Sequence, residues 1–247
     1  MFKALALATL FVSHSVCAEE IINSGDVVLE GHTIVDVEDG VTNIYSGVIS
    51  GTGPIDKTGP GKLVLSGRNT FTSSTVDNRS MGVRIKQGVI EVAGSKESRI
   101  AAKVNGDVSF LNYGAGTLTF EGAGYAQTGD IVATNGTVVI ADGARWKSLG
   151  NLTASGGARI KIVRTADSLK EQAFGRKTLV HLAEDSVLEI PDGSVQCVKY
   201  LYIDGVRMDS GDYSFASIAD ENVKKHFAET AGVLRCIGEP GMSIVIR

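Results

Sequence analysis

Short stretches of alternating apolar and polar residues recur along this chain, and each predicts a strand with one buried face. Two groups are similar in spelling: GPGKLVLSGRNTFT with KQGVIEVAG downstream, and GAGTLTFEGAGYAQT with TNGTVVIADGA downstream. Each group has Gly-x-Gly before its first strand and a second strand after a polar turn. The residues expected to face a common core are Leu63, Leu65, Ile90, Val92, Leu118, Phe120, Val138 and Ile140.

Weaker copies of the pattern continue through the chain and add Val108, Phe110, Ile160, Ile162, Leu188 and Ile190. The step is 20 residues from Phe120 to Ile140 and 22 residues from Ile140 to Ile162. A repeating step of about 20 residues is typical of solenoids, in which each coil buries its apolar face against its neighbours. From Leu65 to Val92 the step is 27 residues, which predicts a bulge through the polar insert SSTVDNRSMG.

Antiparallel hairpins are the structural alternative, because Asp39-Gly40 and Asn135-Gly136 favour tight two-residue turns. The recurrence of Gly-x-Gly before strands at about the same step favours a coil. We therefore expect an all-β fold, with a parallel β-helix over residues 19–190. Residues 191–247 should cap the last coil, since exposed strand edges recruit other chains. One short helix is expected there, within ADENVKKHFAETAG.

The first 18 residues, MFKALALATLFVSHSVCA, have the parts of a secretory signal peptide. Lys3 supplies the positive charge, an apolar run follows, and Val16 and Ala18 occupy the positions before the expected cleavage point. The run is shorter than the roughly 20 residues that span a bilayer. We expect cleavage after Ala18. Acylation of Cys17 is the alternative, which Val16 disfavours because lipid attachment sites normally have a small residue there.

The chain carries 24 Lys and Arg residues against 28 Asp and Glu residues, and its net charge is −4. Loss of residues 1–18 removes Lys3 and no acidic residue, which leaves −5. Such a chain lacks the basic face of a nucleic-acid-binding protein and the Lys/Arg cluster that docks on anionic lipid. We expect no nucleic-acid partner and no transmembrane segment in the mature chain.

Two cysteines, Cys197 and Cys236, remain after removal of the signal peptide. Disulfides persist in exported proteins. A bridge would close a loop of about 40 residues and contribute on the order of 4 kcal/mol in the chain-entropy model. We expect this disulfide; two unpaired, buried thiols are the alternative.

The segment GVISGTGPIDKTGPGKLVLSGRNTFTSST, residues 47–75, resembles the autotransporter-associated β-strand repeat, also called the passenger-associated transport repeat. Phe71 replaces the usual tyrosine of that family and Ser73 the usual glycine. The resemblance is specific over this segment and looser through residue 162. Its pattern is matched at Gly51, Gly53, Lys57, Gly59, Gly61, Leu63, Leu65, Gly67, Asn69 and Thr72.

The resemblance implies a right-handed parallel β-helix in a bacterial surface or secreted protein. A second segment, LYIDGVRMDSGDYSF, looks like one found near the C-terminus of some bacterial exported proteins with these repeats. The chain departs from the autotransporters after residue 162, where the many alternating strands of a membrane barrel are not found. Export through an attached barrel is therefore not expected.

The residues whose side chains could act in catalysis or binding are better explained by structural roles. Asn69 can bond backbone in a turn, and Lys57 suits a solvated face. The histidines lack the spacing of a zinc site: His32, His181 and His226. Two acidic groups lack the spacing of a calcium loop and are expected to form turns: Asp36, Glu38 and Asp39, and Asp204, Asp209 and Asp212. We expect no catalytic residue, no cofactor and no bound metal.

These features predict a non-enzymatic, structural or adhesin-like protein at the cell surface, in the secreted fraction or in the periplasm. It would bind host or envelope proteins or glycans through its extended β-face. A polysaccharide lyase or glycoside hydrolase on the same fold is the alternative, with Asp107, Asp130 and Asp142 gathered by successive coils. Arg145-Trp146-Lys147 would then be a sugar-stacking edge, or else a turn that covers the flank. A remnant of an autotransporter passenger is the third alternative.

Overall fold

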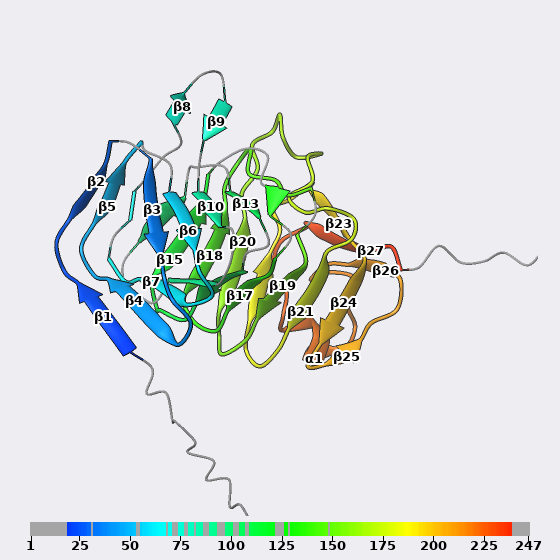
Figure 1. Cartoon of the computed structure of the whole chain (residues 1–247). Coiled ribbons are helices and arrows are strands. Elements are labelled where there is room, and N and C mark those ends of the chain that lie inside the picture. Colours follow the sequence, from blue (N-terminus) through cyan, green and yellow to red (C-terminus); the bar gives the residue numbers. More distant parts are fainter. Residues whose placement is uncertain are drawn as a thin grey trace, which may run out of the picture.

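The computed structural model describes residues 19–238 with short gaps, and its described part is almost entirely β. The gaps are residues 31, 53–54, 68, 71–73, 77–78, 82, 86–88, 93–96, 101–103, 107–108, 122–125, 128 and 148, and only the backbone is described for residues 74–76, 79–81, 83–85, 89, 92, 104–106 and 126–127. The chain winds as a parallel β-helix whose coils stack along the molecule (Figure 1). The expected fold class is confirmed.

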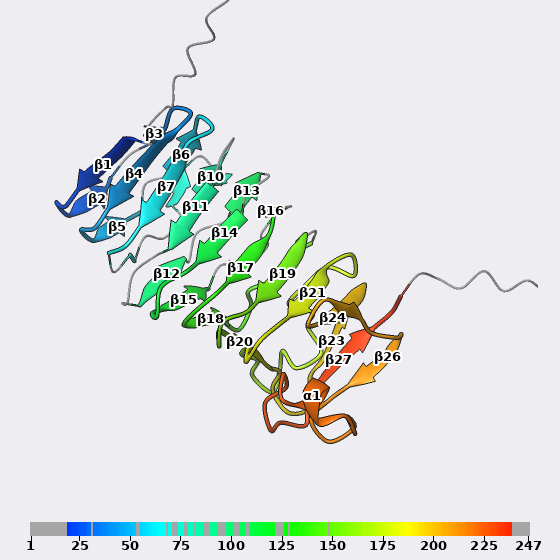
Figure 2. The same cartoon turned by 90° about the horizontal axis from the view of Figure 1, so that it is seen from below.

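The longest face of the coil is a ten-stranded sheet that runs the length of the molecule (Figure 2). Its strands pair in parallel from coil to coil as far as β24, and β25 then pairs antiparallel with β24. In sheet order the strands are β1 (Glu19–Asn23), β4 (Val41–Tyr45), β7 (Lys62–Leu65), β11 (Val89–Val92), β14 (Ser109–Asn112), β17 (Ile131–Ala133), β19 (Asn151–Ala154), β21 (Leu179–Leu182), β24 (Tyr200–Ile203) and β25 (Val206–Arg207).

Two further faces complete the coil, and the strand pairs within them are parallel. One is a five-stranded sheet of β3 (Thr33–Asp36), β6 (Ile55–Thr58), β10 (Val83–Ile85), β13 (Val104–Gly106) and β16 (Ala126–Gln127). The other starts with β2 (Val27–Leu29) and β5 (Ile49–Gly51) and continues as β12 (Ser98–Ile100), β15 (Thr117–Phe120), β18 (Thr137–Ile140), β20 (Arg159–Ile162) and β22 (Val187–Glu189).

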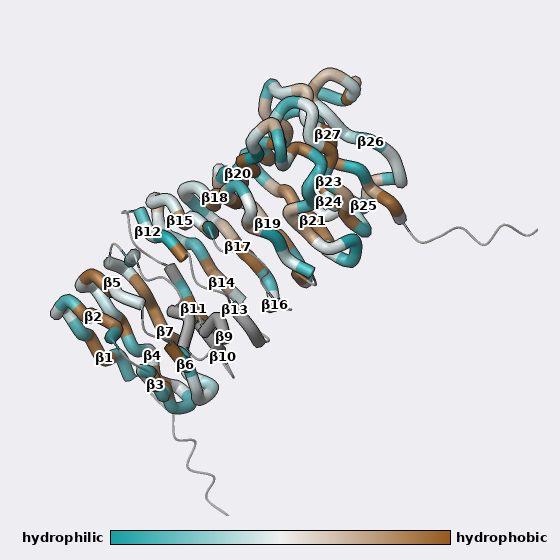
Figure 3. Tube along the Cα trace, turned by 90° about the horizontal axis from the view of Figure 1, so that it is seen from above, coloured by the Kyte–Doolittle hydropathy of each residue, from teal (hydrophilic) through white to brown (hydrophobic). Residues whose placement is uncertain are grey.

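Inward-facing side chains from the three faces form one continuous core. In Figure 3 the hydrophobic segments follow the strands, while the turns between them are more hydrophilic. The sequence-predicted inward residues whose side chains are described are all buried: Leu63, Leu65, Ile90, Phe110, Leu118, Phe120, Val138, Ile140, Ile160, Ile162, Leu188 and Ile190. The side chain of Val92 and all of Val108 lie outside the described residues.

The register confirms the predicted coil steps. Phe120 pairs with Ile140, which in turn pairs with Ile162, and Leu65 pairs with Val92 across the longer step. The additional residues of that step include β8 (Ser74–Val76) and β9 (Arg79–Met81), an antiparallel hairpin that projects from the body (Figure 1). The bulge predicted through SSTVDNRSMG is therefore present.

The turns at Asp39-Gly40 and Asn135-Gly136 do not form hairpins. In each case the strand before the turn and the strand after it belong to different sheets, so the turn is a corner of the coil. Gly40 and Gly136 adopt the positive φ that these corners need, at 74° and 62°. Among the described strands, antiparallel pairing is limited to the β8–β9 hairpin and to the C-terminal region.

The C-terminal region covers the last strands of two faces, β24 and β22, and adds a small sheet of its own. β25 pairs with β24, and β27 (Val233–Cys236) pairs with both β23 (Val195–Val198) and β26 (Gly211–Tyr213). After the short helix α1 (Glu221–Lys224), Leu188 in β22 exchanges backbone hydrogen bonds with His226 and Ala228, at 2.9 and 3.0 Å. Parallel stacking in the longest sheet thus continues past residue 190 to Ile203, and a cap with both parallel and antiparallel pairs follows it.

The N-terminal end of the coil is different. Within the described residues, β1, β2 and β3 each pair with a strand on one side alone. Four of the exposed large apolar side chains lie in these three strands: Ile21, Ile22, Val28 and Ile34. Residues 19–40 also carry no Lys or Arg and seven acids: Glu19, Glu20, Asp26, Glu30, Asp36, Glu38 and Asp39. The predicted signal peptide, including Cys17, lies outside the described residues.

Candidate functional site

The glycines of the repeat motif lie where successive coils approach most closely. A Cβ atom on Gly67 would collide with the carbonyl oxygen of Gly47, and one on Gly47 would collide with that of Gly25. Glycines elsewhere in the motif meet the backbone of the preceding coil in the same way: Gly51, Gly59 and Gly61. Close stacking therefore explains these positions. Gly53 and Thr72 lie outside the described residues.

Asn69 has the turn role that the sequence predicts. Its buried side chain donates from Nδ2 to the carbonyl oxygen of Gly67 at 3.0 Å, and its Oδ1 accepts from the backbone nitrogen of Ile49 at 3.1 Å. The bond from Ile49, which belongs to β5, joins neighbouring coils, whereas the bond to Gly67 is local to the turn. Since both bonds satisfy buried backbone groups, the side chain is committed to the fold.

The prediction that Lys57 lies on a solvated face is wrong. Its side chain has 0% of its surface exposed, and its Nζ donates to the carbonyl oxygens of Thr58 and Gly59 at 2.9 and 2.6 Å. The strand alternation places Lys57 on the same inward side as Ile55. Burial lowers the pKa of Lys57, and the nearby carboxylate of Asp36 partly offsets that effect.

This burial predicts a pH-dependent contribution to stability. A lysine whose pKa is lower in the folded state binds its proton more tightly when unfolded, so stability rises with pH. The penalty is full below the folded-state pKa and disappears as pH passes the unfolded value of about 10.4. We expect the wild-type free energy of unfolding to rise relative to that of Lys57→Met between pH 8 and 11, measured by urea denaturation. A difference that stays constant with pH would contradict this.

The predicted disulfide between Cys197 and Cys236 is not formed, and both thiols are free. In the register of β23 and β27, Cys197 lies opposite Arg235 and Cys236 lies opposite Val198. Because side chains alternate along a strand, the two sulfur atoms face opposite sides of the sheet. Burial raises the pKa of the Cys236 thiol to about 11, although a backbone hydrogen bond from Leu201 acts against this. Cys236 is therefore a small core residue.

The acids proposed for catalysis support turns in the described part of the chain. Asp130 accepts from the backbone and side-chain nitrogens of Asn151, at 2.7 and 2.9 Å. Asp142 accepts from the hydroxyls of Ser168 and Thr165, and the Ser168 bond lowers the pKa of Asp142. No contact joins the two carboxylates, and Asp107 lies outside the described residues.

Trp146 is a core residue, which excludes it from a sugar-stacking edge. It is 3% exposed, and its ring lies edge-on to Phe120 with the ring centroids 5.1 Å apart. Buried Arg164 holds the surrounding turn by donating to the carbonyl oxygens of Ala141, Val163 and Ala144. Of the two interpretations, the turn is the one that agrees with a buried Trp146, whose ring packs in the core.

The three histidines lie apart from one another. His32 contacts Asp56 at 3.0 Å in the first coils, whereas the buried His226 donates from Nδ1 to Ser186 at 2.9 Å near the cap. Asp212 of the acidic group near the cap binds Arg235 through both oxygens, at 2.6 and 2.7 Å. Among the described residues, no cluster of three or more His, Cys, Asp or Glu side chains could hold a metal ion.

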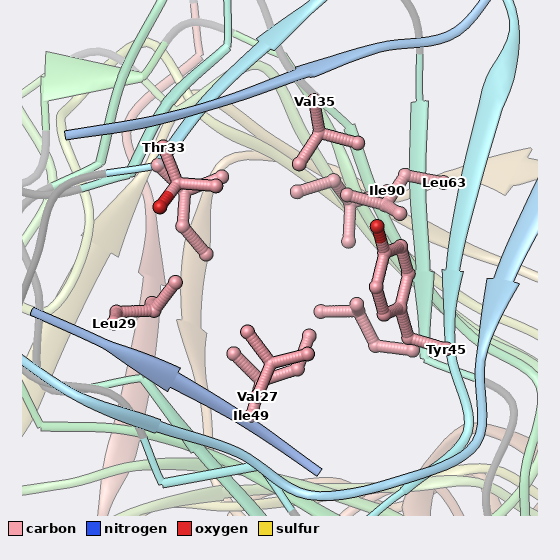
Figure 4. A pocket seen from close by; sticks show the side chains of 10 residues that line it. Val27, Leu29, Thr33, Val35, Tyr45, Ile49, Leu63 and Ile90 are labelled. Atoms are coloured by element: carbon pink, nitrogen blue, oxygen red, sulfur yellow. The ribbon is translucent and has the colours of Figure 1, made fainter. Parts of the chain in front are cut away.

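The interior offers little room for a substrate. Near the N-terminal end, a cavity of about 30 Å³ lies between side chains that point inward from all three faces (Figure 4). Its lining is apolar except for Thr33 and the hydroxyl of Tyr45. An almost wholly apolar lining lacks the polar groups that orient a sugar in a binding site. The chemistry available to a ligand is therefore on the outside.

The outer side of the ten-stranded sheet carries one long row of side chains, aligned by the parallel register. From the first coil to the last described coil, the row comprises Ile22, Ile44, Val64, Glu91, Leu111, Val132, Thr153, His181 and Tyr202. It is mostly apolar and ends in aromatic rings. Because pairing is unbroken, the row is continuous along the sheet, although Val64 within it is buried.

Aromatic rings and cations gather where this row ends. His181 stacks on Tyr202 with ring centroids 4.5 Å apart and planes 7° from parallel, and Tyr200 meets Tyr202 edge-on at 6.4 Å. Lys199 and Arg207 lie 5.1 and 5.2 Å from the centroid of the Tyr200 ring. Burial lowers the pKa of His181 and so favours the neutral ring. The charge of Asp130 partly opposes this effect.

A concave surface lies beside these rings, and we call it the basic hollow. It has a volume of about 640 Å³ and is lined by Gly150, Asn151, Arg176, Lys177, Leu179, Lys199, Ile237 and Gly238. Arg176 and Lys177 come from the turn before β21, and Lys199 immediately precedes β24. Sequence analysis missed all three cations, because no motif links residues brought together by two separate coils.

Comparisons with protein families, with curated proteins and with solved structures found no match to this chain. The described geometry therefore establishes a parallel β-helix with a filled core, whose available chemical groups lie on its outer side.

Proposed function

We propose that this chain is an exported bacterial β-helix protein, structural or adhesin-like and non-enzymatic, that binds proteins or glycans through the outer side of its ten-stranded sheet. The observation that carries the proposal is the long outer row that ends in stacked His181 and Tyr202. Aromatic residues are enriched where proteins bind partners, because they combine a large apolar area with polar tips. Repeat folds use such extended surfaces for binding.

The filled core and the hydrogen bonds of the catalytic candidates support a binding role over a catalytic one. The core is filled by aliphatic and aromatic residues, and the catalytic candidates Asp130 and Asp142 are engaged by neighbouring turns. A hydrolase of glycosides needs two carboxyl groups about 5–10 Å apart across a substrate. Among the described residues that line the basic hollow there is no carboxyl group to form such a pair.

Two sequence features support export. The N-terminal segment has a charged start, an apolar run and a cleavage pattern, and cleavage after Ala18 would leave Glu19, the first residue of β1, as the new N-terminus. The motif glycines are also in the close coil contacts that a repeat of the autotransporter-associated type would require. The resemblance to that family is thus part of the proposal, as an exported protein without an attached barrel.

Expression of the full chain with a C-terminal tag in a Gram-negative bacterium tests this proposal. We expect the protein to be recovered outside the cytoplasm, with a mass that shows loss of residues 1–18. The recovered protein should bind members of a panel of extracellular proteins and polysaccharides without releasing oligosaccharides. Cytoplasmic recovery of the unprocessed chain would overturn export, and catalytic release of oligosaccharides would overturn the non-enzymatic role.

A further inference from the structure

The ten-stranded sheet begins at an open edge, the strand β1. Figure 2 shows β1 at the end of the row of strands, and within the described residues it pairs with β4 alone. The N–H of Glu19 donates to the residue before β4, and the backbone oxygen of Asn23 accepts from the residue after it, at 3.2 and 2.9 Å. Because backbone groups alternate in direction along a strand, Glu20 and Ile22 direct their N–H and C=O groups to the open edge.

The side chains at this edge include exposed apolar ones. Ile22 is 67% exposed and Ile21 is 43% exposed. Ile22 is the first residue of the outer row and lies beside Ile44 of the next coil. A strand added here would form hydrogen bonds with the backbone of Glu20 and Ile22 and would cover part of this apolar surface. The edge therefore fits an extended polypeptide segment.

The charge of the first coils decides which kind of segment fits. Residues 19–56 carry eight acids and no Lys or Arg, whereas residues 57–247 carry 20 acids and 23 Lys and Arg residues. The negative charge of the mature chain is therefore concentrated at the N-terminal end. An acidic segment would meet like charge there, which costs binding free energy, and a basic segment would be attracted.

A hollow beside β1 has the same acidic character. It has a volume of about 300 Å³, lies between β1 and the corner that follows β3, and is lined by Glu19, Ile21, Asp36, Val37, Glu38, Val41 and Asn43. This lining holds three carboxylates and no Lys or Arg. A lysine or arginine side chain from an added strand could lay its apolar stem against Ile21 and Val41 and bring its charge to the carboxylates.

We propose that the edge of β1 binds an extended segment of a partner protein in which basic and apolar residues alternate. The backbone of this segment pairs with Glu20 and Ile22. Because side chains alternate across a sheet, Ile22 lies on one side and Glu19 on the other. The apolar residues of the segment lie beside Ile22, and its Lys or Arg side chains enter the hollow that Glu19 and Glu38 line. This site goes beyond the proposed function, which uses the outer side of the sheet.

A fluorescently labelled peptide of alternating valine and lysine tests the assignment with the full exported protein. We expect its fluorescence anisotropy to rise on binding, less so with added salt, and amide hydrogen exchange at residues 19–23 to slow in the complex. A peptide with glutamate in place of lysine should not bind, because its charge is reversed. The lysine peptide with prolines at its two central positions should not bind either, because proline lacks the N–H donor.

Two substitutions of Ile22 separate backbone pairing from side-chain contact. Ile22→Pro removes the N–H that faces the open edge and keeps the hydrogen bonds to β4, which is the position where an edge strand tolerates proline. Ile22→Ala keeps that N–H and is the matched control. We expect Ile22→Pro to bind the peptide at least about tenfold more weakly than Ile22→Ala, because a buried backbone group of the peptide loses its partner.

A second pair of variants tests the charge of the hollow. Glu38→Lys replaces an attractive charge with a repulsive one and should weaken peptide binding about tenfold at low salt. The matched control is Glu229→Lys, which makes the same change at an exposed glutamate of the C-terminal region and should weaken binding less than about threefold. Circular dichroism before each titration verifies that every variant is folded.

The outcomes separate this inference from the proposed function. Failure of the lysine peptide to bind, equal binding of the glutamate or proline peptide, or equal affinities within either pair of variants overturns the assignment. A stable dimer in which residues 19–23 are protected before peptide is added also overturns it, because the edge then belongs to a second copy. None of these results changes the measurements of export and of ligand binding that decide the proposed function.

Discussion

Replacing Phe120 with alanine is expected to lower the free energy of unfolding by about 3–5 kcal/mol. Phe120 is fully buried in β15, and its ring meets Phe110 and Trp146 edge to face, with ring centroids 5.2 and 5.1 Å apart. Alanine would remove apolar area, break both aromatic contacts and leave a cavity between stacked coils. Urea denaturation followed by circular dichroism measures the loss.

Tyr113→Ala is the matched control for this experiment. Tyr113 follows β14, and 42% of its surface is exposed, so its removal should change stability by no more than about 0.5 kcal/mol. Comparable losses in the two variants would mean that the ring cluster around Phe120 is not a main support of the coil.

Gly67→Ala is expected to destabilise the protein by about 3 kcal/mol, at the upper end of the cost of overpacking. The added Cβ would collide with the carbonyl oxygen of Gly47 in the preceding coil. That oxygen belongs to backbone, which moves only if the coils separate. Thermal unfolding should therefore show a lower midpoint for this variant than for wild type.

Gly25→Ala provides a control at the equivalent position of the first coil. A Cβ atom there has no atom within 4 Å, so the same substitution should be nearly neutral. If Gly25→Ala and Gly67→Ala have similar effects, the cost comes from backbone conformation and not from coil contact, which would contradict the stacking explanation.

The body of the fold could be predicted from sequence because one rule repeats. Alternation identified inward residues such as Leu63 and Phe120, and the spacing of equivalent residues gave the register between coils. The position of the inserted hairpin followed from the single long step between Leu65 and Val92. Each of these features depends on the alternation of apolar and polar residues and on their spacing, and both can be read directly from the sequence.

Individual side chains were harder to place when their type conflicted with the pattern. The charge of Lys57 predicts a solvated position, although alternation with Ile55 directs it inward. The proposed disulfide failed for a related reason, since the one-residue offset between Cys197 and Cys236 is visible only in the register of two distant strands. In both cases the strand geometry decided the outcome.

The basic hollow could not have been found in this way. Lys199 immediately precedes β24. Arg176 and Lys177 lie at the end of the long connection between β20 and β21, and the sequence of that connection has no repeat pattern. Their proximity is a property of the folded chain. The aromatic pair of His181 and Tyr202 likewise depends on the register of β21 and β24.

The N-terminal end of the coil also bears on how this protein behaves in concentrated solution. Within the described residues, β1, β2 and β3 each have one edge without a partner strand, and they expose Ile22, Val28 and Ile34. Such edges resemble the tip of a growing cross-β fibril, onto which further strands could add. The carboxylates of residues 19–40 give two such tips the same negative charge. At neutral pH their mutual repulsion opposes end-to-end polymerisation, so this charge serves colloidal stability.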